Sequence, residues 1–214
     1  MTARPIACAI ALFAFPLVLL TATLVSPTDS TDNATQLAAA ATHGARWSAA
    51  ALLELLAAAL LPLIAAGVAG AVRNRGARLA NVGAILGVLG TLGMAAIAFR
   101  HVFIYGLASI GSEDALHALD RVDHVFGPVA LPLMFAAPLA LIILAAAAVR
   151  AGLAPRWVIA GAVLFFISDM LPIPAAEEVQ GIVGIATFAV LARSVAGRST
   201  TVYAPAARSA TVEA

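Results

Sequence analysis

The chain has 214 residues, of which 63% are hydrophobic and only 11% are charged, and its net charge is +1. Ordinary soluble domains contain about 45–50% apolar and about 25% charged residues, and a soluble fold of this size could not bury so much apolar surface. The composition therefore excludes an ordinary water-soluble protein and predicts a chain that lies mostly in lipid.

Six apolar runs are long enough, or nearly long enough, to cross a membrane, which takes about 20 helical residues. We predict an all-α, polytopic bundle of six transmembrane spans that forms one domain over residues 1–196. The polar, unpatterned segment 197–214 is predicted to be a disordered tail. The six spans are expected at residues 6–25, 48–72, 79–104, 128–149, 157–171 and 174–192, and the last two are short.

The first run has the general layout of a signal peptide, with Arg4 before it and polar residues after it. Two features favour retention as a membrane anchor. The apolar stretch is longer than a typical signal-peptide core, and the boundary reads Leu-Val-Ser-Pro, with Pro27 where cleavage needs an open backbone. Further along the chain, Pro62 and Pro138 fall in mid-span and are expected to kink their helices.

Arginine residues give the orientation. Cytoplasmic loops of membrane proteins carry an excess of basic residues. With the N-terminus inside, most arginines lie on the cytoplasmic side, whereas ten of the eleven acidic residues lie outside or in the outer half. We therefore predict that both termini are cytoplasmic. The arginines predicted inside are Arg4, Arg73, Arg75, Arg78, Arg150, Arg156, Arg193, Arg198 and Arg208.

The Ala- and Arg-rich composition without lysine is typical of a GC-rich bacterial genome, which favours the bacterial cytoplasmic membrane.

Glycines mark a packing face on the third span. Gly83 and Gly87 form a small-xxx-small pair, and Gly90 continues the same face. Such faces let two helix backbones approach closely in lipid. We expect them to pack inside the bundle, with Gly67 and Gly70 of the second span as the opposing surface.

Ionisable residues within spans are candidates for function, because polar groups are costly in lipid. Glu54, Arg100 and Asp169 are the three such candidates, all in the outer half. In the first hypothesis they are structural, and Arg100 pairs with Glu54 or Asp169, since an unpaired buried charge costs several kcal/mol.

In the second hypothesis, His101, His117, Asp120 and His124 bind a metal. A short helix beginning near Ser112 would present His117, Asp120 and His124 on one face at i, i+3 and i+7, before Gly127-Pro128 restarts the chain into the fourth span. Imidazole and carboxylate groups suit zinc, iron or manganese, and two of the histidines could hold a single b-type haem.

In the third hypothesis, Glu54, Asp169 and Arg100 line a path for a proton or a small cation. The almost wholly apolar inner halves of the spans argue against complete transport. The absence of lysine excludes Schiff-base chemistry, and the sequence contains neither a glycine-rich phosphate loop nor a nucleophile elbow. The arginine-rich inner loops are too short to indicate nucleic-acid binding.

The sequence thus favours a small binding or accessory membrane protein rather than an enzyme, with its acidic, histidine-containing polar cluster on the outer side. A metal- or haem-dependent membrane enzyme and a proton or small-cation transporter are the alternatives. The expected partner is the lipid bilayer, and a partner membrane protein and the oligomeric state are left open.

Overall fold

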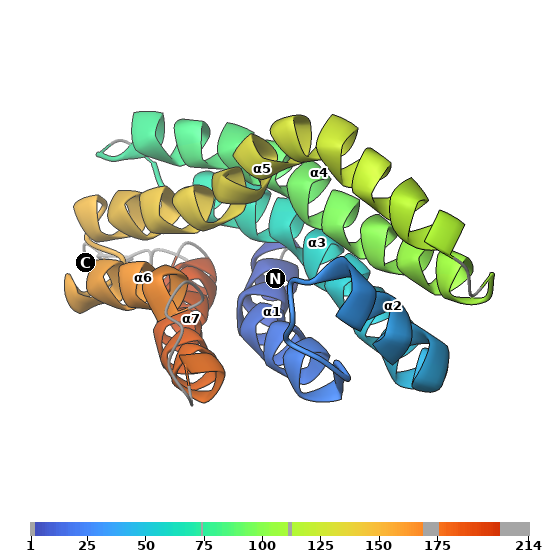
Figure 1. The fold of residues 1–214 in the computed structure, drawn as a ribbon. Coiled ribbons are helices and arrows are strands. Elements are labelled where there is room, and N and C mark those ends of the chain that lie inside the picture. Colours follow the sequence, from blue (N-terminus) through green and yellow to red (C-terminus); the bar gives the residue numbers. More distant parts are fainter. Residues whose placement is uncertain (1–2, 74, 111–112, 169–175, 202–214) are drawn as a thin grey trace, which may run out of the picture.

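The computed structural model describes residues 3–73, 75–110, 113–168 and 176–201. These residues form seven helices and no strand (Figure 1). The helices are α1 (Ala3–Val25), α2 (Asn33–Thr42), α3 (Gly44–Ala71), α4 (Ala77–Ala108), α5 (Glu113–Arg150), α6 (Trp157–Ser168) and α7 (Ala176–Thr201).

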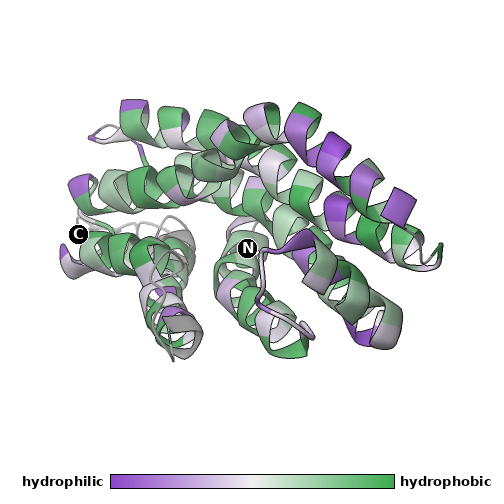
Figure 2. Ribbon diagram, in the orientation of Figure 1, coloured by the Kyte–Doolittle hydropathy of each residue, from purple (hydrophilic) through white to green (hydrophobic). Residues whose placement is uncertain are grey.

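Within this described part, five segments are long and apolar enough to cross a membrane: Pro5–Val25, Gly44–Ala71, Ala77–Ala108, Glu113–Arg150 and Val179–Gly197. Apolar residues dominate most of their length (Figure 2). The chain is therefore an all-helical protein with the composition of a multi-pass membrane protein, as the sequence predicted. α6 is apolar too, but its 12 residues are fewer than the roughly 20 that a crossing takes. The sixth span and the positions of the termini stay predictions.

The six longer apolar helices pack in a closed ring. Each helix contacts the next in the order α1, α3, α4, α5, α6 and α7, and α7 contacts α1 again. The short helix α2 lies outside this ring and packs on α3, α4 and α5. The largest group of buried apolar side chains fills the space between α1, α3, α5 and α7, with Leu61, Ile64, Leu144 and Phe188 fully buried. The ring is thus closed by apolar packing, and α2 is placed beside one end of α4 and α5.

The glycine face of α4 packs inside the protein, as predicted, but against a different surface. A Cβ added to Gly90 would lie 2.5 Å from the Ala137 Cα on α5, and one added to Gly83 would lie 2.8 Å from Leu144. The expected opposing glycines lie elsewhere: Gly67 packs on Cys8 of α1, and nothing lies within 4 Å of a Cβ at Gly70. Gly87 does meet the second span, since a Cβ there would lie 2.8 Å from the Ala65 Cβ on α3, whereas Gly83, Gly90 and Gly93 pack on α5.

One expectation about helix boundaries is wrong. α5 is one continuous helix from Glu113 to Arg150, so Gly127-Pro128 does not restart the chain. The helix contains Pro128, Pro132 and Pro138 and bends in this proline-containing part (Figure 1), as proline inside a helix removes a backbone hydrogen bond. At the other end of the chain, α7 continues to Thr201, and residues 202–214 of the predicted tail lie outside the described residues.

Candidate functional site

The short helix α2 begins with a side-chain cap. Asp32 precedes the helix in extended conformation, and its carboxylate accepts hydrogen bonds from the Thr35 backbone N–H at 2.8 Å and the Thr35 hydroxyl at 2.7 Å. A cap of this kind satisfies an N–H that has no partner within the helix. The hydrogen bond from the Thr35 hydroxyl, followed by that from its backbone N–H, lowers the pKa of Asp32. α2 is therefore a defined helix, and a single residue, His43, separates its end at Thr42 from the start of α3.

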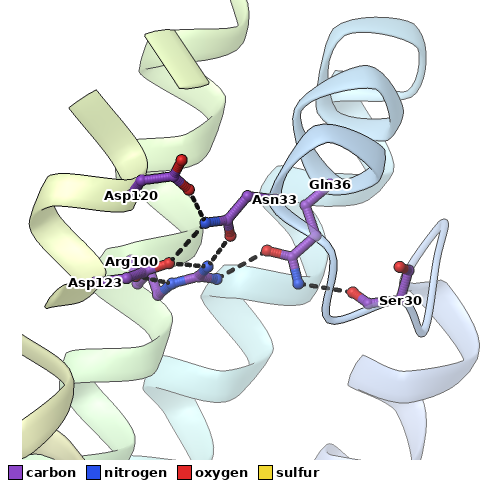
Figure 3. Close-up of polar contacts among 6 residues, drawn as sticks. All are labelled: Ser30, Asn33, Gln36, Arg100, Asp120 and Asp123. Carbon is purple, nitrogen blue, oxygen red and sulfur yellow. Dashed lines mark hydrogen bonds and ion pairs between the residues drawn. The ribbon is translucent and has the colours of Figure 1, made fainter. Parts of the chain in front are cut away.

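Arg100 joins α2, α4 and α5 (Figure 3). Its Nε donates to Asp123 Oδ1 at 2.7 Å, and its Nη2 donates to Asp123 Oδ2 at 2.8 Å. Its remaining donors reach α2, where Nη1 bonds Gln36 Oε1 at 2.8 Å and Nη2 bonds Asn33 Oδ1 at 2.7 Å. Such a two-pronged contact between guanidinium and carboxylate is among the strongest side-chain hydrogen-bond geometries. Arg100 thus holds α5 and α2 against α4.

The amide side chains of α2 complete this network. Asn33 Nδ2 donates to Asp120 Oδ1 at 2.8 Å and to Asp123 Oδ2 at 3.0 Å. Gln36, which is 9% exposed, donates from Nε2 to the Ser30 carbonyl at 2.7 Å. The guanidinium is therefore compensated by one carboxylate and two amides, which offsets the cost of placing a charge at the edge of an apolar bundle.

The structure corrects the predicted pairing of Arg100. Its partner is Asp123, not Glu54, because α5 begins with a helical extension that carries Asp123 alongside the end of α4. Asp169, the other expected partner, lies outside the described residues.

Glu54 pairs instead with His101. Glu54 Oε2 on α3 lies 2.7 Å from His101 Nδ1 on α4, and both side chains are about four-fifths buried, with 23% and 20% exposed. Trp47 supports this pair from α3. Its indole N–H donates to the His101 carbonyl at 2.8 Å, and its ring meets the imidazole edge-on with centroids 5.2 Å apart. Because Trp47 is itself only 4% exposed, His101 is fixed by packing as well as by the carboxylate.

A cavity of about 320 Å³ lies inside the ring, and Glu54 forms part of its wall. All six helices of the ring contribute to the lining, and α2 does not. Among the described residues, the lining is apolar except for Thr23, Glu54 and Gln180. Its volume falls at the lower end of the range typical of small-molecule sites, which are mostly apolar with a few polar groups. Apolar contributions from the separate helices include Phe15, Met94, Met134, Pro138 and Phe165.

The predicted metal ligands do not come together in the described part of the chain, where no group of three His, Cys, Asp or Glu residues could hold a metal ion. His101 faces Glu54, while His117 and His124 are exposed on α5. Asp120 accepts a hydrogen bond from Asn33. The structure therefore offers no observation in favour of the divalent-metal or haem hypothesis.

The sequence prediction gave no role to Asn33, Gln36 or Asp123 in this network. A local signal for α2 was present: an Asp at position 32 followed by an alanine-rich run is typical of a helix start. The tertiary contacts that bring these amides to Arg100, 64 and 67 residues away, leave no such local trace.

No protein-family model matches this chain, and neither a curated protein nor a solved structure matches it. The functional argument therefore depends on the residues and their geometry.

Proposed function

We propose that this protein is a membrane-embedded binding protein that holds a small, mostly apolar molecule in the cavity beside Glu54. The observation that carries the proposal is the cavity itself. It has an apolar lining drawn from all six ring helices, and a carboxylate stands in its wall. Apolar cavities with a few well-placed polar groups are the usual form of a small-molecule site.

The supports around the cavity favour a preformed site. His101 and Trp47 fix the position of Glu54, and the network around Arg100 ties together α4 and α5, the helices that carry other parts of the wall. Sites whose polar groups are held in place bind more tightly, because less conformational freedom is lost on binding.

A photoreactive analogue tests this proposal. The protein would be placed in phosphatidylcholine nanodiscs, irradiated with a diazirine-bearing octanol, and the labelled residues mapped by mass spectrometry. We expect labelling at cavity residues such as Met94 and Met134. Ile97→Trp, which places a larger ring at the cavity wall, should reduce this labelling severalfold.

Ile85→Trp is the matched control, because Ile85 lies on the same helix with 63% of its surface exposed and outside the cavity lining. It should leave cavity labelling unchanged. Cavity labelling that is unchanged by Ile97→Trp, or labelling that is spread evenly over exposed residues such as Leu92, would contradict the proposed site.

We further propose that the protein makes six crossings of the bacterial cytoplasmic membrane with both termini in the cytoplasm. Arg75, Arg78 and Arg150 gather around one hollow where α4 begins and α5 ends, and clustered arginines favour the cytoplasmic side. The Glu54 cavity and the Arg100 network then belong to the outer half.

Thiol labelling of intact spheroplasts tests this orientation. The native Cys8 is 1% exposed, so it gives little background. With a membrane-impermeant reagent, Asp29→Cys should react in intact cells and Arg75→Cys only after lysis. The reverse pattern would overturn the orientation.

A further inference from the structure

We infer that the ligand of the Glu54 cavity is a lipophilic amine, with its ammonium group on Glu54 and its hydrocarbon part in the apolar cavity. This inference deepens the proposed function and depends on it.

The first step concerns the two oxygens of Glu54. Oε2 is occupied by His101 Nδ1 at 2.7 Å. Oε1 has no hydrogen-bond partner among the described residues. Within the same residues, no buried side-chain oxygen or nitrogen lacks a partner, so Oε1 is accessible rather than enclosed. Glu54 itself lines the cavity, and apart from Thr23 and Gln180 the other described residues of the wall are apolar.

The second step concerns charge. The neighbouring cation on α4 is Arg100, and Asp123, Asn33 and Gln36 engage its guanidinium. It therefore does not neutralise Glu54. A carboxylate in surroundings of low polarity is costly unless a cation pairs with it, so an ammonium group on the cavity side of Glu54 would offset part of that cost.

The third step concerns the rest of the ligand. The other polar groups among the described lining residues, Thr23 and Gln180, are uncharged, and Thr23 already donates its hydroxyl hydrogen to the Leu19 carbonyl. The remaining wall consists of aromatic, methionine and aliphatic side chains such as Phe15, Met134 and Phe166. A ligand that matches this wall has a single polar end and a hydrocarbon body.

Ligand binding can be followed by the intrinsic fluorescence of Trp47. The protein has two tryptophans, and Trp157→Phe would leave Trp47, whose ring lies 5.2 Å from that of His101, as the single fluorophore. This variant, in phosphatidylcholine nanodiscs at pH 7, would be titrated with octylamine, octanol and octanoate. A hydrogen bond to a charged group is stronger than one between neutral groups, so we expect octylamine to bind roughly tenfold or more tightly than the other two.

Glu54→Gln should abolish the preference for octylamine, whereas Asp120→Asn should retain it, since Asp120 is an outer carboxylate outside the cavity lining. Equal affinities for the three compounds, or tightest binding of octanoate, would overturn the amine inference and leave the proposed cavity site standing. Retention of the octylamine preference in Glu54→Gln would also overturn the amine inference. A lack of saturable change with all three compounds would overturn the proposed function as well.

Discussion

Glu54 on α3 and His101 on α4 face each other across 2.7 Å at the wall of an apolar cavity, and Trp47 fixes the histidine from behind. The adjacent residue Arg100 turns instead toward Asp123 and α2. Arg100 and His101, which are neighbours on α4, thus have different structural roles. His101 positions an acidic group at the cavity, and Arg100 ties three helices together.

Removal of the Arg100 guanidinium should weaken the fold. Arg100→Gln leaves the partly buried Asp123 without its two charge-assisted hydrogen bonds to the guanidinium. Each such bond is typically worth about 1.5–3 kcal/mol, and partial exposure to solvent reduces that contribution. We expect a loss of about 2 kcal/mol in the free energy of unfolding, measured by titrating the detergent-solubilised protein with sodium dodecyl sulfate. Arg121→Gln is the control, since Arg121 is exposed, and it should change stability by less than about 0.5 kcal/mol. Equal effects of the two changes would contradict the role given to Arg100.

Double-mutant cycles test whether the Arg100–Asp123 pair is energetically independent of the Glu54–His101 pair. Arg100→Gln and Asp123→Asn act on one pair, so the double variant should be less destabilised than the sum of the single variants by about 1 kcal/mol. Arg100→Gln and Glu54→Gln act on different pairs, and their effects should add to within about 0.5 kcal/mol. Strong coupling between Arg100 and Glu54 would show that these two groups interact directly, contrary to the structure.

The contact between α4 and α5 depends on the absence of a side chain at Gly90. Gly90→Ala would place a Cβ 2.5 Å from the Ala137 backbone, and overpacking of this kind costs about 1–3 kcal/mol. Gly70→Ala is the matched control on α3, because a Cβ there has nothing within 4 Å. It should leave stability unchanged or raise it by up to about 1 kcal/mol through helix propensity. The unfolding titration checks both variants, and a Gly90→Ala protein as stable as the parent would argue against this close approach.

The cap of α2 should respond to pH. The pKa of Asp32 is lowered in the folded protein, so its contribution is present above the ordinary value of 3.8 and is lost as the pH falls through the lower folded value. Asp32→Ala should therefore reduce hydrogen-exchange protection of the α2 amides at pH 7, and the difference from the parent should narrow below about pH 3. An undiminished difference at the acidic end would show that the charge of Asp32 contributes nothing.

The sequence predicted the membrane-type helices because long apolar runs are a local signal that needs no knowledge of the fold. It also indicated Glu54, Arg100 and His101, because ionisable residues stand out in apolar segments. It could not indicate which of them meet. The partner of Arg100 was mistaken because the local pattern at Gly127-Pro128 favours a new start, whereas α5 is continuous and its first part carries Asp123 to Arg100. The cavity has no sequence signature, since its wall is assembled from residues of six separate helices.

The central claim is that the cavity beside Glu54 holds a small, mostly apolar molecule, and its most direct test is to identify what the protein retains from its own membrane. The parent protein, Ile97→Trp and Ile85→Trp would each be purified in native nanodiscs, extracted with solvent and compared by mass spectrometry. We predict a near-stoichiometric molecule in the parent and in Ile85→Trp that is depleted severalfold in Ile97→Trp. The same set of lipids in equal amounts from all three proteins would contradict the account.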